Sequence, residues 1–103
     1  MNDKLLGLLG IARRGGKLMI GFEMCSEAIE KSRAKLIIVA SDTAKRTEKE
    51  LRFKAGERPV EIIRISADKF NLSRAIGTSA GVIAVCDEGF AKRASELINQ
   101  GGN

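Results

Sequence analysis

A continuous apolar run spans residues 36–40, and the polar residues Ser41 and Asp42 follow it directly. Because the run is rich in β-branched residues and does not alternate with polar positions, it predicts a strand that is buried on both faces. A strand of this kind needs a layer of structure on each side. We therefore expect helices to cover both faces of a central sheet.

Helical and extended patterns alternate along the whole chain. Helices are predicted from Asn2 and Asp3 to residues 14–16, from Gly21 to 32–34, over 44–55, from Ser66 or Asp68 to Gly77, and from Asp87 onward. Strands are predicted at 17–20, 35–40, 60–65 and 82–86. Alternation with short connections implies a three-layer α/β/α sandwich, and we expect residues 1–103 to form a single domain.

Polar residues at the end of the central strand mark one edge of the predicted sheet. Asp42 or Thr43 can cap the helix over residues 44–55, as Asp87 can cap the last helix. The helix that begins after Gly21 leads straight into the central strand, so it begins near the carboxyl end of that strand. Gly21 and Asp42 should therefore lie at the same edge.

The charge of the chain favours an acidic partner. Its 103 residues include 18 Lys and Arg against 13 Asp and Glu, a net charge of +5 with a pI near 9.6. Such a balance suits RNA, DNA or an anionic surface. No segment approaches the ~18 continuous apolar residues of a membrane span, and the amino terminus does not resemble a signal peptide. We expect a cytoplasmic protein that contacts no membrane and is a monomer.

The reactive side chains give little support to catalysis. Cys25 and Cys86 are far apart in sequence among apolar neighbours, which favours two buried thiols over a disulfide or a metal site. The chain has no histidine, the usual general base and the commonest metal ligand. We therefore expect a protein that is not an enzyme and that binds no cofactor or metal.

Basic residues form three clusters, and each of them is also compatible with an ordinary solvated surface. The clusters are Arg13, Arg14 and Lys17; Lys31, Arg33 and Lys35; and the outer face of the helix over residues 44–55. Arg33 and Lys35 precede the central strand and should lie opposite Asp42. Arg13, Arg14, Lys45 and Arg46 are the better candidates for contacts with phosphate.

Several motifs, in their order and spacing, resemble one protein family. They are Leu8–Arg13, Gly21 before a helix, Ala34–Ala40 followed by Asp42, Leu72–Gly77 and Val85–Ala91. Together they resemble the YlxQ-like bacterial branch of the kink-turn-binding ribosomal protein superfamily, which also includes archaeal and eukaryotic large-subunit proteins. The resemblance covers nearly the whole chain and implies a three-layer α/β/α fold with a mixed four-stranded sheet.

The resemblance also implies an RNA site. In that family, RNA with a sharply kinked internal loop is bound by the glycine-led turn before the second helix and by the loop before the last strand. The corresponding residues here are Gly21, Phe22, Glu23, Met24 and Glu27, and Ile76, Gly77, Thr78, Ser79 and Gly81. Free N–H groups at a helix amino terminus can receive phosphate oxygens, and glycines permit close approach of the backbone.

The chain departs from the family pattern at three positions. RNA-binding members typically carry Gly, any residue, Asn, Glu, two residues and Lys, whereas this chain has Glu23, Met24 and Glu27. Glu27 in place of Lys reverses a charge beside a polyanion, a change that can exceed the ~1–3 kcal/mol of one good base contact. The leading hypothesis is recognition of kinked or looped structured RNA, ribosomal in origin. The alternative is a protein-interaction or ribosome-assembly module with weak or lost kink-turn binding.

Four features have two interpretations each. Glu27 either contacts RNA or pairs with Lys31 on the helix surface. Asp42 either caps a helix or contacts the ligand, and the loop over residues 77–81 either ends a helix or clasps RNA. Phe53 lies away from the core stripe of its helix, so it either packs under the loop near Gly56 or stacks on a base.

Overall fold

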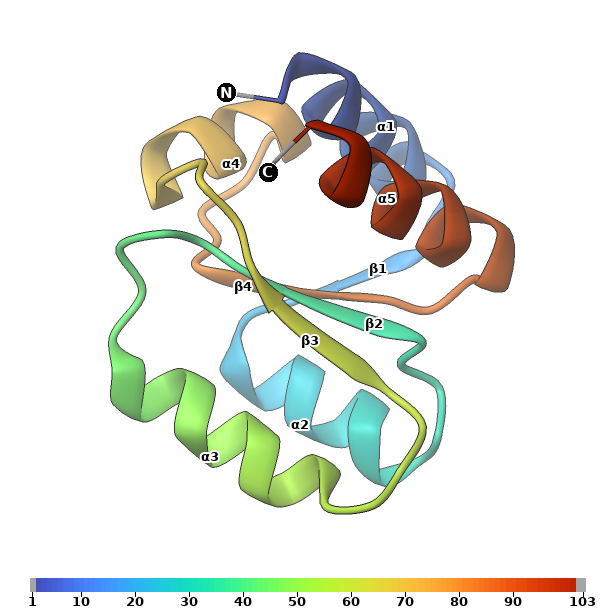
Figure 1. The fold of residues 1–103 in the computed structure, drawn as a ribbon, viewed down its shortest axis with the longest axis vertical. Helices are drawn as coiled ribbons and strands as arrows, with labels where there is room; N and C mark the ends of the chain where they lie inside the picture. Colours follow the sequence, from blue (N-terminus) through green and yellow to red (C-terminus); the bar gives the residue numbers. More distant parts are fainter. Residues whose placement is uncertain (1, 102–103) are drawn as a thin grey trace.

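The computed structural model describes residues 2–101 and shows the predicted alternation of helices and strands (Figure 1). The elements are α1 (Asp3–Arg14), β1 (Leu18–Ile20), α2 (Phe22–Glu30), β2 (Leu36–Val39), α3 (Lys45–Ala55), β3 (Glu61–Arg64), α4 (Lys69–Ile76), β4 (Val82–Val85) and α5 (Glu88–Gly101). The order is the predicted one, and the bounds differ from the predicted bounds by a few residues at most.

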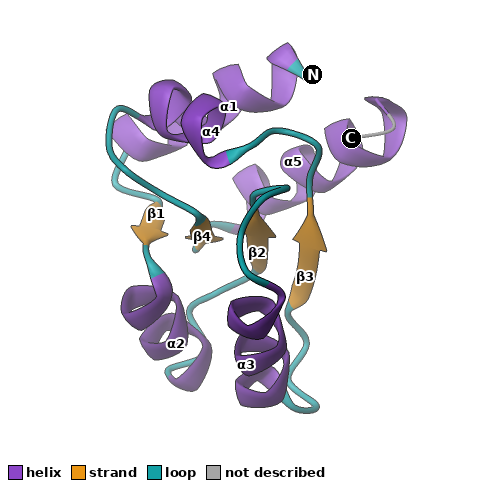
Figure 2. Ribbon diagram, turned by 90° about the vertical axis from the view of Figure 1, so that its left-hand side faces the viewer, coloured by secondary structure: helices purple, strands orange, loops and turns teal. Residues whose placement is uncertain are grey.

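The strands form one mixed sheet of four strands in the order β1-β4-β2-β3. β4 is antiparallel to both of its neighbours, whereas β2 and β3 are parallel and are connected through α3. Helices α1, α4 and α5 cover one face of the sheet, and α2 and α3 cover the other (Figure 2). The predicted three-layer α/β/α sandwich is confirmed.

The central strand β2 is buried on both faces, as its apolar run predicts. Leu36 and Ile38 pack into the core beneath α1, α4 and α5. Ile37 and Val39 point the other way, into the core that α2 and α3 share with the sheet. Successive side chains of a strand alternate between its faces, so a continuous apolar run is what two separate cores require.

Side chains cap three of the helices at the predicted residues. The Asn2 side chain accepts a hydrogen bond from the N–H of Leu5, at 3.1 Å. The Asp68 carboxylate accepts one from the N–H of Asn71 at 2.8 Å. The side chain of Asp87, just before α5, accepts one from the N–H of Phe90. These side-chain acceptors satisfy backbone donors that have no partner inside the helix.

The prediction that Asp42 or Thr43 caps α3 is wrong. The residue before α3 is Ala44, and α3 has no side-chain cap. Asp42 instead accepts a hydrogen bond from the N–H of Lys69 at 2.8 Å, so it supports the first turn of α4. Thr43 donates its hydroxyl to the carbonyl of Gly81 at 2.6 Å. Both side chains are used in long-range contacts that sequence spacing does not reveal.

Both cysteines are free, as predicted. Cys25 is fully buried between α2 and the sheet, and Cys86 is half-buried at the end of β4. Burial, together with the charge of the nearby Cys86 thiolate, raises the pKa of Cys25 to about 12. Burial also raises the pKa of Cys86. Neither thiol has the lowered pKa of a reactive cysteine.

Candidate nucleic-acid interface

Three separate segments meet at the end of the sheet where β1 and β2 finish and β4 begins, which we call the strand-end edge. It consists of Gly21, residues 40–44 and the loop over residues 77–81, and it faces the viewer in Figure 2. The N–H of Gly21 bonds to the carbonyl of Val82 at 3.0 Å, and the N–H of Ala40 bonds to the carbonyl of Gly81 at 3.0 Å. The prediction that Gly21 and Asp42 share one edge is confirmed, and the 77–81 loop lies there with them.

Gly21 turns the chain from β1 into α2 in a conformation that requires glycine. Its φ of +94° and ψ of 163° lie in a region that residues with a Cβ essentially avoid. A glycine has no side chain to cap the helix, so the first N–H groups of α2 keep no partner within the helix. These donors, with the helix dipole, favour an anion at this end of α2.

Acidic residues on α2 act against that tendency. Glu23, Met24 and Glu27 are all exposed. Glu27 accepts a hydrogen bond from Lys31 at 2.7 Å, so the predicted helix-surface pair is present. That hydrogen bond and the charge of Lys31 lower the pKa of Glu27. Glu27 is therefore ionised at neutral pH and places a negative charge on this face of α2.

Arg64, at the end of β3, holds the corner over residues 40–43 in place. Its Nη1 donates to the carbonyls of Ala40, Ser41 and Thr43, at 3.1, 3.0 and 2.8 Å. Its Nε donates to Glu48 on α3 at 2.8 Å. Sequence reasoning missed this residue, although a charged side chain in the apolar pattern of β3 is a signal that it has buried partners.

Glu48 connects α3 to this corner through Arg64, and it also pairs with Arg52 of α3 itself. It accepts hydrogen bonds from Arg52 and Arg64, and only about a fifth of its side chain, 19%, is exposed. Burial by itself raises the pKa of Glu48, but the hydrogen bonds from Arg52 and Arg64 and their charges outweigh it, so the pKa is lowered. The two arginines thus stabilise the charged form of the Glu48 carboxylate.

The loop over residues 77–81 is fixed at both ends. Gly77 ends α4 in the left-handed region with a φ of +80°, and a Cβ there would meet open space. Near the other end, the N–H of Ala80 bonds to the hydroxyl oxygen of Ser73 at 2.9 Å. Gly81 lies so close to Thr43 and Lys69 that a Cβ would approach atoms of both at 3.0 Å. This loop is therefore a built part of the edge.

The residues predicted in this loop differ in what they can offer a ligand. Gly77 and Ser79 are exposed, and Thr78 and Gly81 are half-buried. Ile76 is only 5% exposed, because it is the last residue of α4 and packs into the core. The side chain of Ile76, a predicted contact residue, therefore lies in the core and not on the exposed surface of the loop. The exposed part of the loop begins at Gly77.

Lys69 lies against the strand-end edge and is, after Arg64, the second residue that sequence reasoning missed. Asp42 holds its backbone N–H, and its methylene groups lie against Gly81. Its side chain is exposed. A shallow hollow beside the loop is lined by Lys69, Phe70, Ser73, Arg74, Gly77, Thr78 and Ser79. The guanidinium of Arg74 lies 5.7 Å from the centre of the Phe70 ring, so an aromatic and two cations border the hollow.

The predicted phosphate contacts fall into two groups. Lys45 and Arg46 begin α3 directly after the corner, and both are exposed. Arg13 and Arg14 instead end α1, which leads into the start of β1 at the opposite end from Gly21. Arg14 lies beside Gly10, where α1 packs against α4. The structure therefore brings only Lys45 and Arg46 to the strand-end edge.

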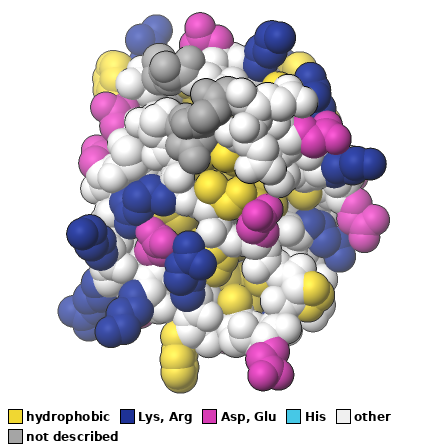
Figure 3. All heavy atoms as spheres, in the orientation of Figure 1, with side chains coloured by type: hydrophobic (Ala, Val, Ile, Leu, Met, Phe, Trp, Pro, Cys, Tyr) yellow, Lys and Arg dark blue, Asp and Glu magenta, His cyan; other side chains and the backbone are white. Residues whose placement is uncertain are grey.

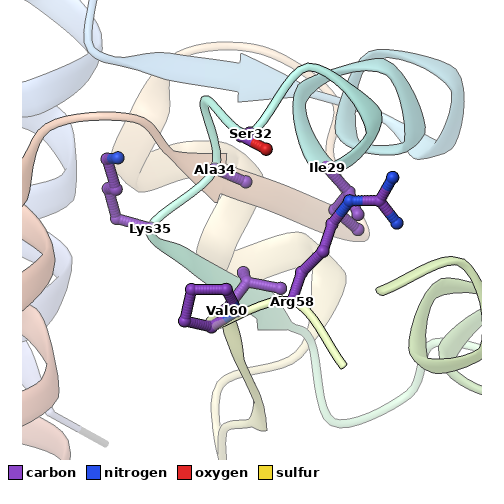
Figure 4. Close-up of a pocket in the computed structure, with 7 residues that line it drawn as sticks. Ile29, Ser32, Ala34, Lys35, Arg58 and Val60 are labelled. Atoms are coloured by element: carbon purple, nitrogen blue, oxygen red, sulfur yellow. The ribbon is translucent and has the colours of Figure 1, made fainter. Parts of the chain in front are cut away.

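Arg33 and Lys35 lie at the opposite end of the sheet, as predicted. The N–H of Lys35 bonds to the carbonyl of Val85, at the end of β4. Lys35 and Arg58 border a cavity of about 140 Å³ there, which Figure 4 shows with Ile29, Ser32, Ala34 and Val60. This cavity is remote from Gly21 and Asp42 and forms no part of the strand-end edge.

The part of the chain that the structure describes offers no metal centre. Within residues 2–101, no group of three or more His, Cys, Asp or Glu side chains is placed to hold a metal ion. Across the same residues, no helix has both the length and the apolar composition needed to span a membrane.

Comparison with known proteins identifies the family. Residues 3–95 match the model of the Ribosomal protein L7Ae/L30e/S12e/Gadd45 family. The chain belongs to this family. It is 33% identical over 96 residues to the RNA-binding protein YlxQ of Enterococcus faecium, with 93% of this chain and 92% of that protein covered. It is 32% identical over 93 residues to the RNA-binding protein YlxQ of Bacillus subtilis (strain 168), with 89% and 92% covered.

Two solved structures have a similar fold. A protein with unknown function from Bacillus halodurans C superposes with a TM-score of 0.87 at 34% identity, with 93% of this chain and 97% of that chain covered. The Giardia lamblia 15.5kD RNA binding protein superposes with a TM-score of 0.72 at 20% identity, with 97% and 89% covered. The second likeness supports the L7Ae-type fold alone.

Proposed function

We propose that this protein binds structured RNA with a sharply kinked internal loop, ribosomal in origin, at the strand-end edge. The observation that carries the proposal is that direct hydrogen bonds hold Gly21, the corner over residues 40–43 and the 77–81 loop together. Membership of the L7Ae family supports it, as do the relatives named RNA-binding proteins. In this proposal the protein acts by binding alone, without catalysis. Its place of action is the cytoplasm.

The backbone of the edge supplies donors that do not depend on side chains. The first N–H groups of α2 can receive phosphate oxygens, and Gly77 exposes backbone without a Cβ to block close approach. A kinked RNA exposes bases and edges that a regular duplex hides in its deep, narrow groove. Shape recognition by backbone groups is therefore compatible with the absence of the family's Asn, Glu and Lys pattern.

Phosphate contacts come from the two helices that begin at the edge. Lys45 and Arg46 lie at the start of α3, and Lys69 lies at the start of α4. Arg13 and Arg14 remain predicted contacts only for an RNA that extends from the edge across α4 to the end of α1. Such contacts position the RNA and make its affinity depend on salt.

The test is a binding titration against a kink-turn RNA and a straight duplex of equal length and base composition, at two salt concentrations. We expect the kink-turn RNA to bind more tightly at both concentrations. We also expect the affinity to fall with salt for both RNAs, because phosphate contacts release counterions. Equal affinities for the two RNAs would refute shape recognition.

A charge-reversing substitution tests the role of Glu27. Glu27→Lys removes a carboxylate beside the first turn of α2 and should tighten kink-turn binding roughly tenfold, equivalent to ~1.4 kcal/mol. The matched control is Glu96→Lys on α5, which changes the net charge equally but lies on the opposite layer in an exposed pair with Arg93. An unchanged or weaker affinity of Glu27→Lys would contradict the electrostatic argument.

The second candidate is a protein-interaction or ribosome-assembly module. The observation in its favour is that ionised Glu27 and exposed Met24 occupy the positions on α2 at which the family pattern has Lys and Glu. If it is correct, protein partners recovered from cells should survive nuclease treatment. Crosslinking in cells, with the attached peptides mapped, separates the two candidates, because RNA joined to residues 21–27 or 77–81 supports the first.

A further inference from the structure

A groove between α2 and α3 contains an aromatic side chain that the core does not use. The groove is lined by Phe22, Arg46, Lys49, Glu50, Phe53 and Lys54. Phe53 is 88% exposed, so the interpretation that it packs under the loop near Gly56 is wrong. The reason is its place on α3: Leu51 and Ala55 take the buried positions, and Phe53 lies on the outer side between them.

Three cations, Arg46, Lys49 and Lys54, and one carboxylate, Glu50, line the groove. Lys and Arg side chains gather over the α3 side of the molecule, at the lower left of Figure 3. Arg46 pairs with Glu50 at 3.1 Å, and Lys54 pairs with Glu30 of α2 at 2.7 Å. Lys49 forms no ion pair with any of the described residues. At least one cation beside the Phe53 ring is therefore available to an anionic ligand.

The groove is continuous with the strand-end edge. Phe22, which lines it, is the first residue of α2 and follows Gly21 directly. Arg46 lines it as well and belongs to the first turn of α3, next to the corner over residues 40–43. Two residues that line the groove therefore adjoin the strand-end edge, so a strand of RNA that leaves the edge meets the groove next.

We propose that the α2–α3 groove binds unpaired nucleotides that flank the kinked RNA, with one base stacked on Phe53 and phosphates near Arg46 and Lys49. The proposal rests on the function proposed above and extends its site. An exposed ring among cations is the arrangement by which proteins hold single strands, since every base has a face that can stack. An apolar peptide anchor instead needs a pocket in which it is fully buried, and the Phe53 ring lies exposed on the surface.

The experiment compares two RNAs that differ only in an unpaired extension. The first is a minimal kink-turn RNA, and the second carries a single-stranded extension of about six nucleotides, within the range that such sites cover. The wild-type protein should bind the extended RNA about 5- to 150-fold more tightly, the effect of one stacked base. Phe53→Ala should remove most of this gain and leave the affinity for the minimal RNA unchanged.

The control and a spectroscopic readout make the result specific. Ile11→Ala removes an exposed apolar side chain, 52% exposed, from α1 on the opposite layer and should preserve the gain. The chain contains no Trp and no Tyr, so Phe53→Trp introduces a single fluorophore. The extended RNA should quench its emission by stacking, and the minimal RNA should not.

The outcomes separate this inference from the function on which it rests. If neither RNA is preferred over a straight duplex, the proposed function fails. If the minimal kink-turn RNA binds specifically but the extension adds nothing, the groove proposal is overturned while the function stands. A gain from the extension that survives Phe53→Ala also overturns it, because the added nucleotides then lie elsewhere.

Discussion

Arg64 makes a prediction that separates hydrogen-bond geometry from charge. Its guanidinium bonds three carbonyls of the corner over residues 40–43 and also the Glu48 carboxylate. Arg64→Lys keeps the charge but loses the planar fork, since an ammonium group cannot reach several carbonyls and a carboxylate in fixed directions. Arg64→Ala loses both the fork and the charge.

The magnitude follows from these contacts. One nitrogen, Nη1, serves the three carbonyls with two hydrogens, so we count two hydrogen bonds to the corner and one to Glu48. Bonds to a charged group contribute ~1.5–3 kcal/mol each, but 27% of the Arg64 side chain is exposed and solvent weakens the ion pair. We expect a loss of ~2–4 kcal/mol for Arg64→Ala and about half of that for Arg64→Lys.

Thermal and urea unfolding monitored by circular dichroism measure these losses. For a domain of this size ~1 kcal/mol corresponds to roughly 4–8 °C in Tm, so Arg64→Ala should unfold at least about 8 °C below the wild type. Arg46→Lys, in an exposed pair on the same side of the molecule, is the control and should change stability by less than ~0.5 kcal/mol. If Arg64→Lys is as stable as the wild type, the fork geometry contributes nothing and the reasoning is refuted.

Three further predictions concern stability and reactivity. Gly21→Ala should lower stability by ~1–3 kcal/mol because of its backbone conformation, whereas Gly7→Ala, exposed inside α1, should raise it by ~0.5–1 kcal/mol; a loss at both positions in urea unfolding would contradict this. The folded-state pKa of Glu48 is lowered, so its contribution is complete above the unfolded pKa near ~4.3 and lost as the pH falls through the folded value. Unfolding measured between neutral and acidic pH should therefore show a shallower acid decline for Glu48→Gln than for the wild type, and equal declines would exclude that role. In the folded protein at neutral pH, Cys25 should resist alkylation and react only after addition of denaturant, as mass spectrometry of modified peptides can show.

The sequence predicted the layers well because the signals for them are local. Apolar runs and helical spacing mark which residues must leave water, and the run over residues 36–40 required a covered strand. The common edge of Gly21 and Asp42 also followed, since the path from α2 into β2 fixes where α2 begins. No knowledge of individual side-chain contacts was needed for either prediction.

The errors arose where side chains have partners far away in sequence. Spacing alone favours Asp42 and Thr43 as caps of α3, but their actual partners are Lys69 and Gly81. Arg64 likewise bonds to a corner more than 20 residues away, which no local pattern indicates. Long-range polar contacts of this kind decide the details of the candidate site, and they become visible only with the fold.

The charge distribution suggests how RNA would sit on the strand-end edge. Glu23 and ionised Glu27 make the α2 side less favourable for phosphate than the helix terminus alone would be. The cations Lys45 and Lys69 lie at the starts of α3 and α4, not on α2. A polyanion should therefore be displaced from α2 toward these two helices, with the Gly77 loop beneath it. On that path the α2–α3 groove lies beside the cations of α3. The same positive charge should therefore attract RNA both to the strand-end edge and to the groove.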